Sequence, residues 1–341
     1  MKKKSLAIAL LSILPLAAAQ AQTSVQIYGI ADASIGIEDT DAPGEDSRTV
    51  ISSGTQSTSR IGFRGTEDLG NGLKALFNVE AGYAIDTGAS DTAGLFQRRA
   101  VVGLQGAFGT ITVGREYGPI AAVAQSADPL GHGFYGSSLT GFGNGRLTRR
   151  LSNSVNYKSD PFAGGLTFLA AYSAGERQTD DPSGSLVGAA VEYKNGPLYL
   201  GAGYQQTERL ATGDDKEYTV GAGFTVGAFD LRAVYMEAEP EGPNNEFKYA
   251  TVGGIYTAGP NKFYASVHQQ RLENGARGNG FSLAYSYTLS KRTNLYSSYG
   301  RVRNNGLGVF GLTSAGGTFA PPATAPGADP QVFNVGVRHS F

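Results

Sequence analysis

Apolar and polar residues alternate along most of this chain with a period of two. In the clearest run, Phe281, Leu283, Tyr285, Tyr287 and Leu289 take every second position, and small or polar residues stand between them. Successive side chains of a β-strand point to opposite faces, so this alternation predicts strands with one apolar, aromatic face and one small, polar face. Sixteen such runs predict strands at 24–38, 57–67, 72–85, 96–105, 110–116, 149–158, 165–174, 186–193, 198–208, 216–226, 230–238, 247–257, 262–272, 280–288, 293–302 and 331–341.

The connections between these predicted strands alternate in length. Short connections hold turn residues, as in Leu69-Gly70-Asn71 and Gly259-Pro260-Asn261, whereas long ones are acidic or rich in glycine. The long connections are 39–56, 86–95, 117–148, 175–185, 209–215, 239–246, 273–279 and 303–330. Short turns at one end and long loops at the other, over an even number of strands, are typical of outer-membrane barrels. The pattern therefore predicts an all-β protein, a transmembrane antiparallel β-barrel of 16 strands.

The last predicted strand is suited to closing this barrel. Lipid offers no hydrogen-bond partners, so a membrane sheet cannot keep an unpaired edge. Phe333, Val335, Val337, His339 and Phe341 fall on one face of the strand, and polar or small residues fall on the other. We expect this strand to pair with the first one; the alternative is an ordinary edge strand.

The segment from Gly114 to Arg150 interrupts the alternation. It is the longest inner stretch with neither a strand nor a helix pattern, and it is rich in glycine and small residues. A loop this long in an ordered protein is usually either functional or disordered. We expect 117–148 to fold inside the wall of strands and to narrow the space there.

The N-terminal residues predict a targeting segment, and the composition excludes some classes of protein. A basic start at Met1–Lys4, an apolar run at Leu6–Leu16 and the sequence Ala19-Gln20-Ala21 predict a signal peptide over 1–21 that is cleaved, which leaves the barrel at 22–341. No later apolar run is long enough for a transmembrane helix. The chain has 49 glycines, 18 tyrosines and 17 phenylalanines, which suits a barrel. It has no cysteine, so packing and hydrogen bonds must stabilise it.

One motif resembles a known family. Ser59–Ala75 resembles the second-to-third-strand motif of the Gram-negative general porins, in their β-proteobacterial and neisserial branch. The resemblance extends over the whole mature chain. Further matches lie at Val25–Gly29, Leu95–Leu104, Phe108–Thr110, Val113–Arg115, Asn153–Tyr157 and Val335–Phe341.

The resemblance implies a homotrimer in the outer membrane, in contact with its lipid and lipopolysaccharide, with a water-filled pore in each subunit. It implies ion transport and passive diffusion of small hydrophilic solutes, without catalysis, cofactor or metal. The third extracellular loop, here 117–148, would form the constriction, and the closing Phe341 resembles a signal for outer-membrane assembly. No basic patch indicates nucleic-acid binding.

Alternation also predicts which charges face the lumen. Ile61 and Phe63 should face lipid, so Arg60 and Arg64 should point inward. Since Leu151, Val155 and Tyr157 share a face, Arg150 should point inward with Ser152, Ser154 and Asn156. Arg98 matches the arginine of the family's fourth-strand motif, and its neighbour Arg99 would face outward, although this pair could be reversed. A charge that faces lipid at mid-depth costs roughly 2–4 kcal/mol, so these arginines require water.

The resemblance assigns roles to several of these residues. Arg60, Arg98 and Arg150 match a basic ladder on the wall of related porins, and Asp128 matches an acid of the inward loop. The alternatives are that the arginines are solvated without a selective role and that Asp128 is a turn or cap residue. Arg115, at a strand end, belongs to the candidate constriction or else pairs with loop carboxylates.

The loop and its ends hold two acids, Glu116 and Asp128, against Arg115, Arg146, Arg149 and Arg150. The local charge predicts an anion preference, although the formal net charge of the chain is −1. Salt screening limits the reach of distant charges to about 8–10 Å, so charges at the gap should dominate.

Two other functions stay open. A substrate-specific channel would show an aromatic slide, for which Phe134, Tyr135 and Phe142 are hints. An outer-membrane barrel enzyme would need a nucleophile with a base, but the three histidines are far apart in the sequence, and no G-x-S-x-G, H-E-x-x-H or P-loop pattern occurs.

Overall fold

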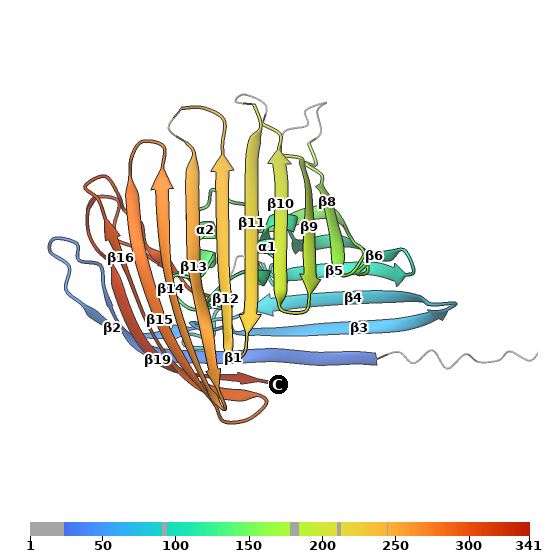
Figure 1. Cartoon of the computed structure of the whole chain (residues 1–341), viewed down its shortest axis with the longest axis horizontal. Coiled ribbons are helices and arrows are strands. Elements are labelled where there is room, and N and C mark those ends of the chain that lie inside the picture. Colours follow the sequence, from blue (N-terminus) through green and yellow to red (C-terminus); the bar gives the residue numbers. More distant parts are fainter. Residues whose placement is uncertain (1–23, 91–93, 178–183, 210–212, 244) are drawn as a thin grey trace, which may run out of the picture.

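The strands form one closed antiparallel barrel (Figure 1). The computed structural model describes residues 24–90, 94–177, 184–209, 213–243 and 245–341, so the predicted signal peptide lies outside the described residues. The first strands are β1 (Ser24–Asp39), β2 (Arg48–Ser53), β3 (Arg60–Gly70), β4 (Leu73–Gly82), β5 (Arg99–Gly106), β6 (Gly109–Tyr117), β7 (Arg150–Lys158), β8 (Leu166–Ser173) and β9 (Leu186–Asn195). They are followed by β10 (Leu198–Thr207), β11 (Asp215–Val226), β12 (Phe229–Glu239), β13 (Phe247–Ala258), β14 (Asn261–Leu272), β15 (Arg277–Thr288), β16 (Thr293–Asn304) and β19 (Gln331–Ser340).

The barrel closes through its first and last strands. β1 pairs with β19 from Ile30 opposite Ser340 to Asp39 opposite Gln331. Beyond the strand, Gly29 and Phe341 exchange backbone hydrogen bonds, both 3.1 Å long. β1 is thus paired with β19 on one side and with β2 and β3 on the other, which confirms the predicted pairing of the last strand with the first.

Two strands share the second position in the barrel, next to β1. β2 pairs with the later half of β1 and β3 with its earlier half, and the chain leaves the sheet between them at 54–59. If β2 and β3 are counted as one strand, the barrel has the sixteen strands that the alternation predicts. The prediction of a loop over the whole of 39–56 is wrong at Arg48–Ser53, because this short, serine-rich run shows no clear alternation.

A buried carboxylate binds the segment between β2 and β3. Asp32 on β1 accepts hydrogen bonds from the backbone N–H of Ser57 at 2.7 Å and of Gln56 at 3.2 Å. The hydroxyl of Tyr296 on β16 donates to its other oxygen at 2.5 Å. The backbone that leaves the sheet therefore finds its hydrogen-bond partners on the inner wall.

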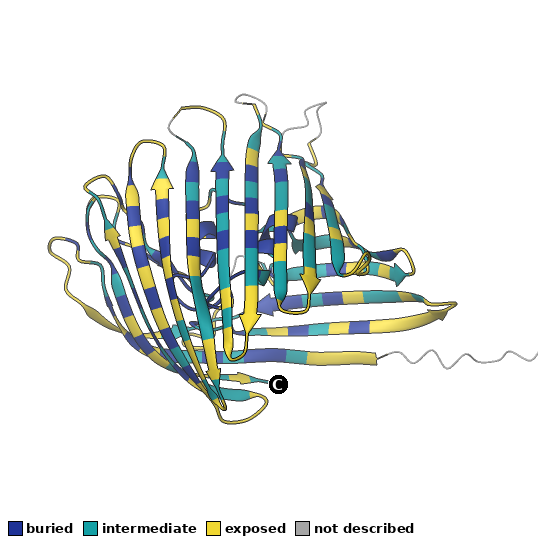
Figure 2. Cartoon of the chain, in the orientation of Figure 1, coloured by how far each residue is buried: buried dark blue, intermediate teal, exposed yellow. Residues whose placement is uncertain are grey.

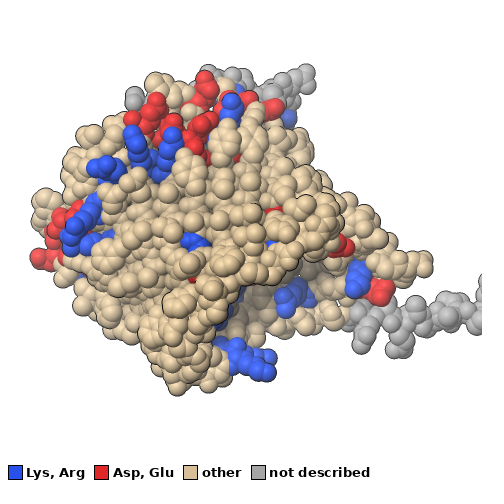
Figure 3. All heavy atoms as spheres, in the orientation of Figure 1, with Lys and Arg blue, Asp and Glu red and all other residues tan. Residues whose placement is uncertain are grey.

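The two faces of the wall differ as the alternation predicts. On β15, Leu283 is 52% exposed on the outer face, whereas Ser282 is 1% exposed on the inner face. Figure 2 shows the same banding along neighbouring strands. In Figure 3, charged side chains gather at the long-loop ends of the strands, and the broad face below them is largely uncharged. A wide apolar belt of this kind suits contact with lipid. Neither helix in the part of the chain that the structure describes has the length and apolarity to cross a membrane.

The chain between β6 and β7 runs inside the barrel. It holds α1 (Pro119–Ser126) and α2 (Leu139–Phe142), two helices that the sequence pattern did not predict. Buried apolar residues of α1, such as Ile120 and Ala124, pack against the inner face of the wall. Glycines of the wall make room for this contact, because a Cβ at Gly221 would lie 2.6 Å from the Cβ of Ala127.

The last long connection also reaches the inner loop. It forms a small hairpin of β17 (Leu312–Thr313) and β18 (Thr318–Phe319). The backbone N–H of Thr313 donates to the Thr140 hydroxyl at 3.1 Å, and Ala315 N–H donates to the Gly133 carbonyl at 2.8 Å. The inner loop is thus attached to the wall on one side and to a second loop on the other.

Candidate functional site

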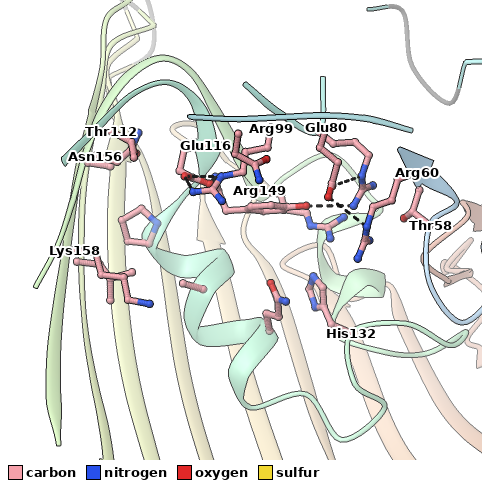
Figure 4. Close-up of a pocket in the computed structure, with 18 of the residues that line it drawn as sticks. Thr58, Arg60, Glu80, Arg99, Thr112, Glu116, His132, Arg149, Asn156 and Lys158 are labelled. Carbon is pink, nitrogen blue, oxygen red and sulfur yellow. Dashed lines mark hydrogen bonds and ion pairs between the residues drawn. The ribbon is translucent and has the colours of Figure 1, made fainter. Parts of the chain in front are cut away.

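A cavity of about 600 Å³ lies between the inner loop and the inner face of β3–β7 (Figure 4). The wall contributes most of its charged side chains, and the loop contributes Gln125 and His132. The cations that line it are Arg60, Arg64, Arg98, Arg99, Arg149 and Lys158, and the acids are Glu80 and Glu116. The arrangement places a basic wall opposite the loop.

Glu80 on β4 is the central acid of the wall. Its carboxylate accepts from Arg98 Nε at 2.7 Å, and Arg60 Nε lies 3.3 Å from its second oxygen. The Tyr28 hydroxyl donates to the same second oxygen at 3.1 Å. Glu80 is 8% exposed, so these partners replace its lost water. One carboxylate therefore compensates two of the arginines that the sequence singled out.

Arg98 and Arg99 both line the cavity. Arg98 precedes β5, and Arg99 begins it on the inner face, since Val102 on the opposite face is 61% exposed. Arg99 Nε donates to Glu116 on β6 at 2.9 Å. The expectation that Arg99 faces outward is wrong, because alternation sets in only at Arg99 and the preceding turn places Arg98 inside as well.

A bulge changes the inner face where β6 meets β7. The register shifts between Gly114 and Glu116, and Asn153 has a φ of 52°. Leu151 is consequently buried at 2% exposure, whereas Val155 is 47% exposed on the outer face. The expectation that these two share a face is therefore wrong, since a bulge inserts one residue and reverses the alternation beyond it.

The same bulge sets the positions of two consecutive arginines. Arg149 lines the cavity, whereas Arg150 is not among the residues that line it. The Arg150 guanidinium lies 4.9 Å from the centre of the Tyr117 ring, and that of Arg149 lies 5.5 Å from it. Arg150 Nη2 also donates to the Tyr117 hydroxyl at 3.2 Å. Arg149 thus faces the gap at the position that the sequence analysis gave to Arg150.

Arg149 has no acidic partner within the described residues. Its burial, followed by the neighbouring Arg150, lowers the pKa of its guanidinium. A guanidinium stays charged at neutral pH even when its pKa is lowered. Arg149 therefore contributes a positive charge to the cavity that no carboxylate offsets.

Two other predicted residues occupy different settings. Arg64 lines the cavity, with its guanidinium 4.9 Å from the centre of the Tyr28 ring and its Nε donating to Gln26 at 3.0 Å. Arg115 does not line the cavity; its Nε donates to the carbonyl of Gln97 at 2.6 Å. Arg115 thus binds the segment that leads into β5.

Asp128 lies inside the loop rather than at the gap. It is fully buried and accepts from the backbone N–H of Leu130 at 2.7 Å and of Ser138 at 2.6 Å. His132 Nδ1 lies 2.7 Å from the Ser138 hydroxyl and 3.6 Å from the Asp128 carboxylate. Burial lowers the pKa of His132 to about 4, so the ring is neutral at neutral pH. In this geometry Asp128 organises the loop, as its alternative interpretation as a turn residue allowed.

The aromatic residues that hinted at a specific channel do not line the cavity. Phe134 is 1% exposed and packs edge-on against Tyr296 with ring centres 5.6 Å apart. Tyr135 and Phe142 are also buried. The histidines do not form a catalytic set either, because His268 stacks on Tyr249 and His339 bonds to Thr293. In the described ranges no group of three His, Cys, Asp or Glu side chains could hold a metal.

Sequence reasoning missed several residues of the cavity. Glu80 lies on the polar face of the predicted strand 72–85, together with Asn78, so alternation could have placed it in the lumen. Lys158 continues the inward face of Ser154 and Asn156, so alternation could have placed it in the lumen as well, whereas Arg149 follows from the alternation only once the bulge at Asn153 is known. Tyr117 gave no signal, because it ends a strand at the start of a long loop.

The closed barrel, its apolar belt and its charged inner gap define an outer-membrane channel. The family model of the Gram-negative porins matches residues 7–307, and the chain therefore belongs to this family. It is 33% identical to outer membrane porin protein 32 of Delftia acidovorans, over the full length of both chains. The solved anion-selective porin from Comamonas acidovorans is similar at 30% identity and a TM-score of 0.84, over 94% of this chain and 100% of that one.

A more distant structure shows how far the fold extends. The trimer form of OmpT from Vibrio cholerae has 21% identity and a TM-score of 0.69, with 94% of this chain and 99% of that one covered. At this identity the likeness concerns the fold alone. The protein is thus a porin of the outer membrane, a passive channel for small solutes.

Proposed function

We propose that this porin prefers anions over cations and that the preference arises where the inner loop narrows the barrel. The observation that carries the proposal is the charge of the cavity wall, where the described part of the chain places six cations and two acids. The related porin from Comamonas acidovorans is described as anion-selective, which supports the proposal.

The ion pairs of the described residues distinguish the cations that have a carboxylate partner from those that have none. Glu80 is shared by Arg60 and Arg98, and Glu116 is paired with Arg99. Within the described residues no carboxylate lies within ion-pair distance of Arg64, Arg149 or Lys158. A positive potential in a narrow, low-dielectric passage attracts anions and repels cations. The uncompensated cations therefore set the sign of the preference, and the pairs mainly hold the wall together.

The test is the reversal potential of the purified protein in a planar bilayer under a potassium chloride gradient. We expect an anion-selective reversal potential and its reduction in Arg149→Gln. Arg277→Gln is the matched control, because Arg277 is exposed at the start of β15 and does not line the cavity. A cation-selective wild-type channel, or equal effects of the two substitutions, would contradict the proposal.

We further propose that the protein is a homotrimer in contact with outer-membrane lipid and lipopolysaccharide. The likeness to the trimer form of OmpT supports this only at the level of the fold. The expected contacts are the first strands and loop 86–95, part of which lies outside the described residues. Light scattering of the detergent-solubilised protein should give three times the mass of one chain, and a monomer mass would refute the trimer.

Phe341 is proposed to act in assembly of the barrel. Its ring occupies the space beside Gly29, where an added Cβ would lie 2.3 Å from it. Because it follows the closing strand and pairs with Gly29 of β1, its loss should reduce the amount of assembled barrel in the outer membrane without changing the selectivity of the barrels that form. Quantifying folded protein in membranes after Phe341→Ala tests this, with Phe333→Ala on the same strand as the control.

A further inference from the structure

We infer that Tyr117 is the positioning residue of the constriction: its ring and hydroxyl hold Arg149 and Arg150 in place while leaving their positive charge uncompensated. This inference rests on the proposed anion preference and adds the residue on which the uncompensated charge depends. Tyr117 acts through the arginines and does not itself need to touch the permeating ion.

The contacts converge on a single phenol. The hydroxyl oxygen of Tyr117 accepts from Arg150 Nη2 at 3.2 Å and from Arg98 Nη2 at 3.4 Å. The face of the ring lies 4.9 Å from the Arg150 guanidinium and 5.5 Å from that of Arg149. Three guanidinium groups, from the turn before β5 and from the start of β7, thus meet at one side chain.

The backbone fixes this side chain firmly. Tyr117 is the last residue of β6 and lies directly opposite Arg150 in the ladder. The next residue, Gly118, donates its N–H to the Arg149 carbonyl at 3.1 Å, and Pro119 then begins α1. The Glu116 carboxylate accepts from the Tyr117 N–H at 3.0 Å. The ring is therefore anchored at the point where the chain turns from the wall into the loop.

An aromatic ring solves a problem that a carboxylate could not. Two adjacent guanidinium groups repel each other, and an acid would hold them but would also cancel part of their charge. The face of a tyrosine ring attracts cations through its quadrupole and carries no net charge. Tyr117 can therefore stabilise crowded arginines while the positive field of the gap remains, which is what an anion-selective passage requires.

Substitutions separate the ring from the hydroxyl. Tyr117→Phe keeps the ring face that contacts both arginines and loses only the hydroxyl acceptor, so its selectivity should fall less than that of a variant that loses both. Tyr117→Leu loses both, and Arg149 and Arg150 become free to turn toward Glu80, Glu116 or bulk water. We expect the anion-to-cation permeability ratio of Tyr117→Leu to fall by about threefold, in line with the loss of a cation–π contact. Tyr117→Met, which keeps more of the bulk, gives the same comparison if the leucine variant does not assemble.

A second background tells positioning from a general effect on the loop. In a channel that carries Arg149→Gln and Arg150→Gln, Tyr117→Leu should not change the permeability ratio further, because the groups on which the ring acts are gone. A merely structural role would shift the selectivity equally in both backgrounds.

Reversal potentials of these variants under a salt gradient decide the matter. A ratio in Tyr117→Leu and Tyr117→Met equal to that of the wild type would overturn the inference, and so would an equal fall in the background without the two arginines. The proposed function fails separately, if the wild-type channel itself shows no anion preference.

Discussion

Two arginine groups lie at or beside the same gap, and the wall stabilises them in different ways. On β3–β5, Arg60 and Arg98 share the carboxylate of Glu80. Where β6 meets β7, Arg149 and Arg150 lie over the ring of Tyr117, and no carboxylate of the described residues pairs with them. The Glu80 carboxylate offsets part of the positive charge of the first group, whereas the ring of Tyr117 leaves the positive charge of the second group in place. The comparison teaches that the number of arginines in a pore does not determine its field, because the type of partner decides how much charge remains.

The largest effect should come from removing the acid of the first group. Glu80→Gln removes the carboxylate that accepts from Arg98 Nε, on a side chain that is 4% exposed. Breaking a buried ion pair by removal of one partner costs about 3–5 kcal/mol. We expect the free energy of unfolding in detergent, measured by denaturant titration, to fall by this amount, whereas the anion preference should rise because more charge is uncompensated.

The control for that change is Glu116→Gln. Its partner Arg99 has a side chain that is 34% exposed, so water can replace part of the lost interaction. The loss of stability should therefore be clearly smaller than for Glu80→Gln. Equal losses would mean that Glu80 is not the central acid of the wall.

The strands and much of the wall could be predicted from the sequence, because alternation depends only on the local pattern. Arg60, Arg64 and Arg98 line the cavity. The exchange of Arg150 for Arg149 could not be foreseen, because the bulge at Asn153 reverses the alternation within one strand and leaves no mark in the composition. The sequence Asp128-Pro129 is equally compatible with a gap-facing acid and with a turn, and only the fold of the loop distinguishes them.

The paired groups show a second limit of sequence reasoning. Alternation could have placed Glu80 in the lumen, but its pairing with Arg98 depends on how the turn before β5 folds. Cross-strand distances of this kind are set by register, and a single sequence contains no direct record of it. Whether an arginine has a carboxylate or an aromatic ring as its partner could therefore not be predicted from the sequence.

The loop that faces both groups offers a test that depends on pH. Burial lowers the pKa of His132 from the usual 6.5 to about 4. Between these values the unfolded chain binds more protons than the folded one, so stability should fall as the pH drops through this window. The total loss from this group is on the order of 3 kcal/mol.

Denaturant titrations at several pH values between 7 and about 4 measure this loss. The variant His132→Asn keeps a polar side chain near Ser138 but cannot titrate, so the slope of stability against pH should be smaller in it than in the wild type. His339→Asn is the control, because the exposed His339 bonds to Thr293 at the barrel end, far from the loop. Unchanged slopes in His132→Asn would show that the neutral ring is not what makes the loop sensitive to acid.

The smallest effect on stability, and the sharpest contrast between the two groups, should come from Arg149→Gln. This substitution removes a partly buried charge that pairs with no acid of the described residues, so the folded state loses no ion pair among them. We expect the free energy of unfolding to stay constant or to rise by about 1 kcal/mol, as is common when a group kept for function at a cost in stability is replaced. The anion preference should fall in the same variant.

Arg98→Gln should show the opposite pattern, because it removes a partner of Glu80 and so lowers stability, while the carboxylate keeps Arg60 beside it. Parallel unfolding and reversal-potential measurements on the two variants test the comparison directly. If Arg149→Gln destabilised the barrel as much as Arg98→Gln does, the ring of Tyr117 would be holding Arg149 for the stability of the wall rather than for its field.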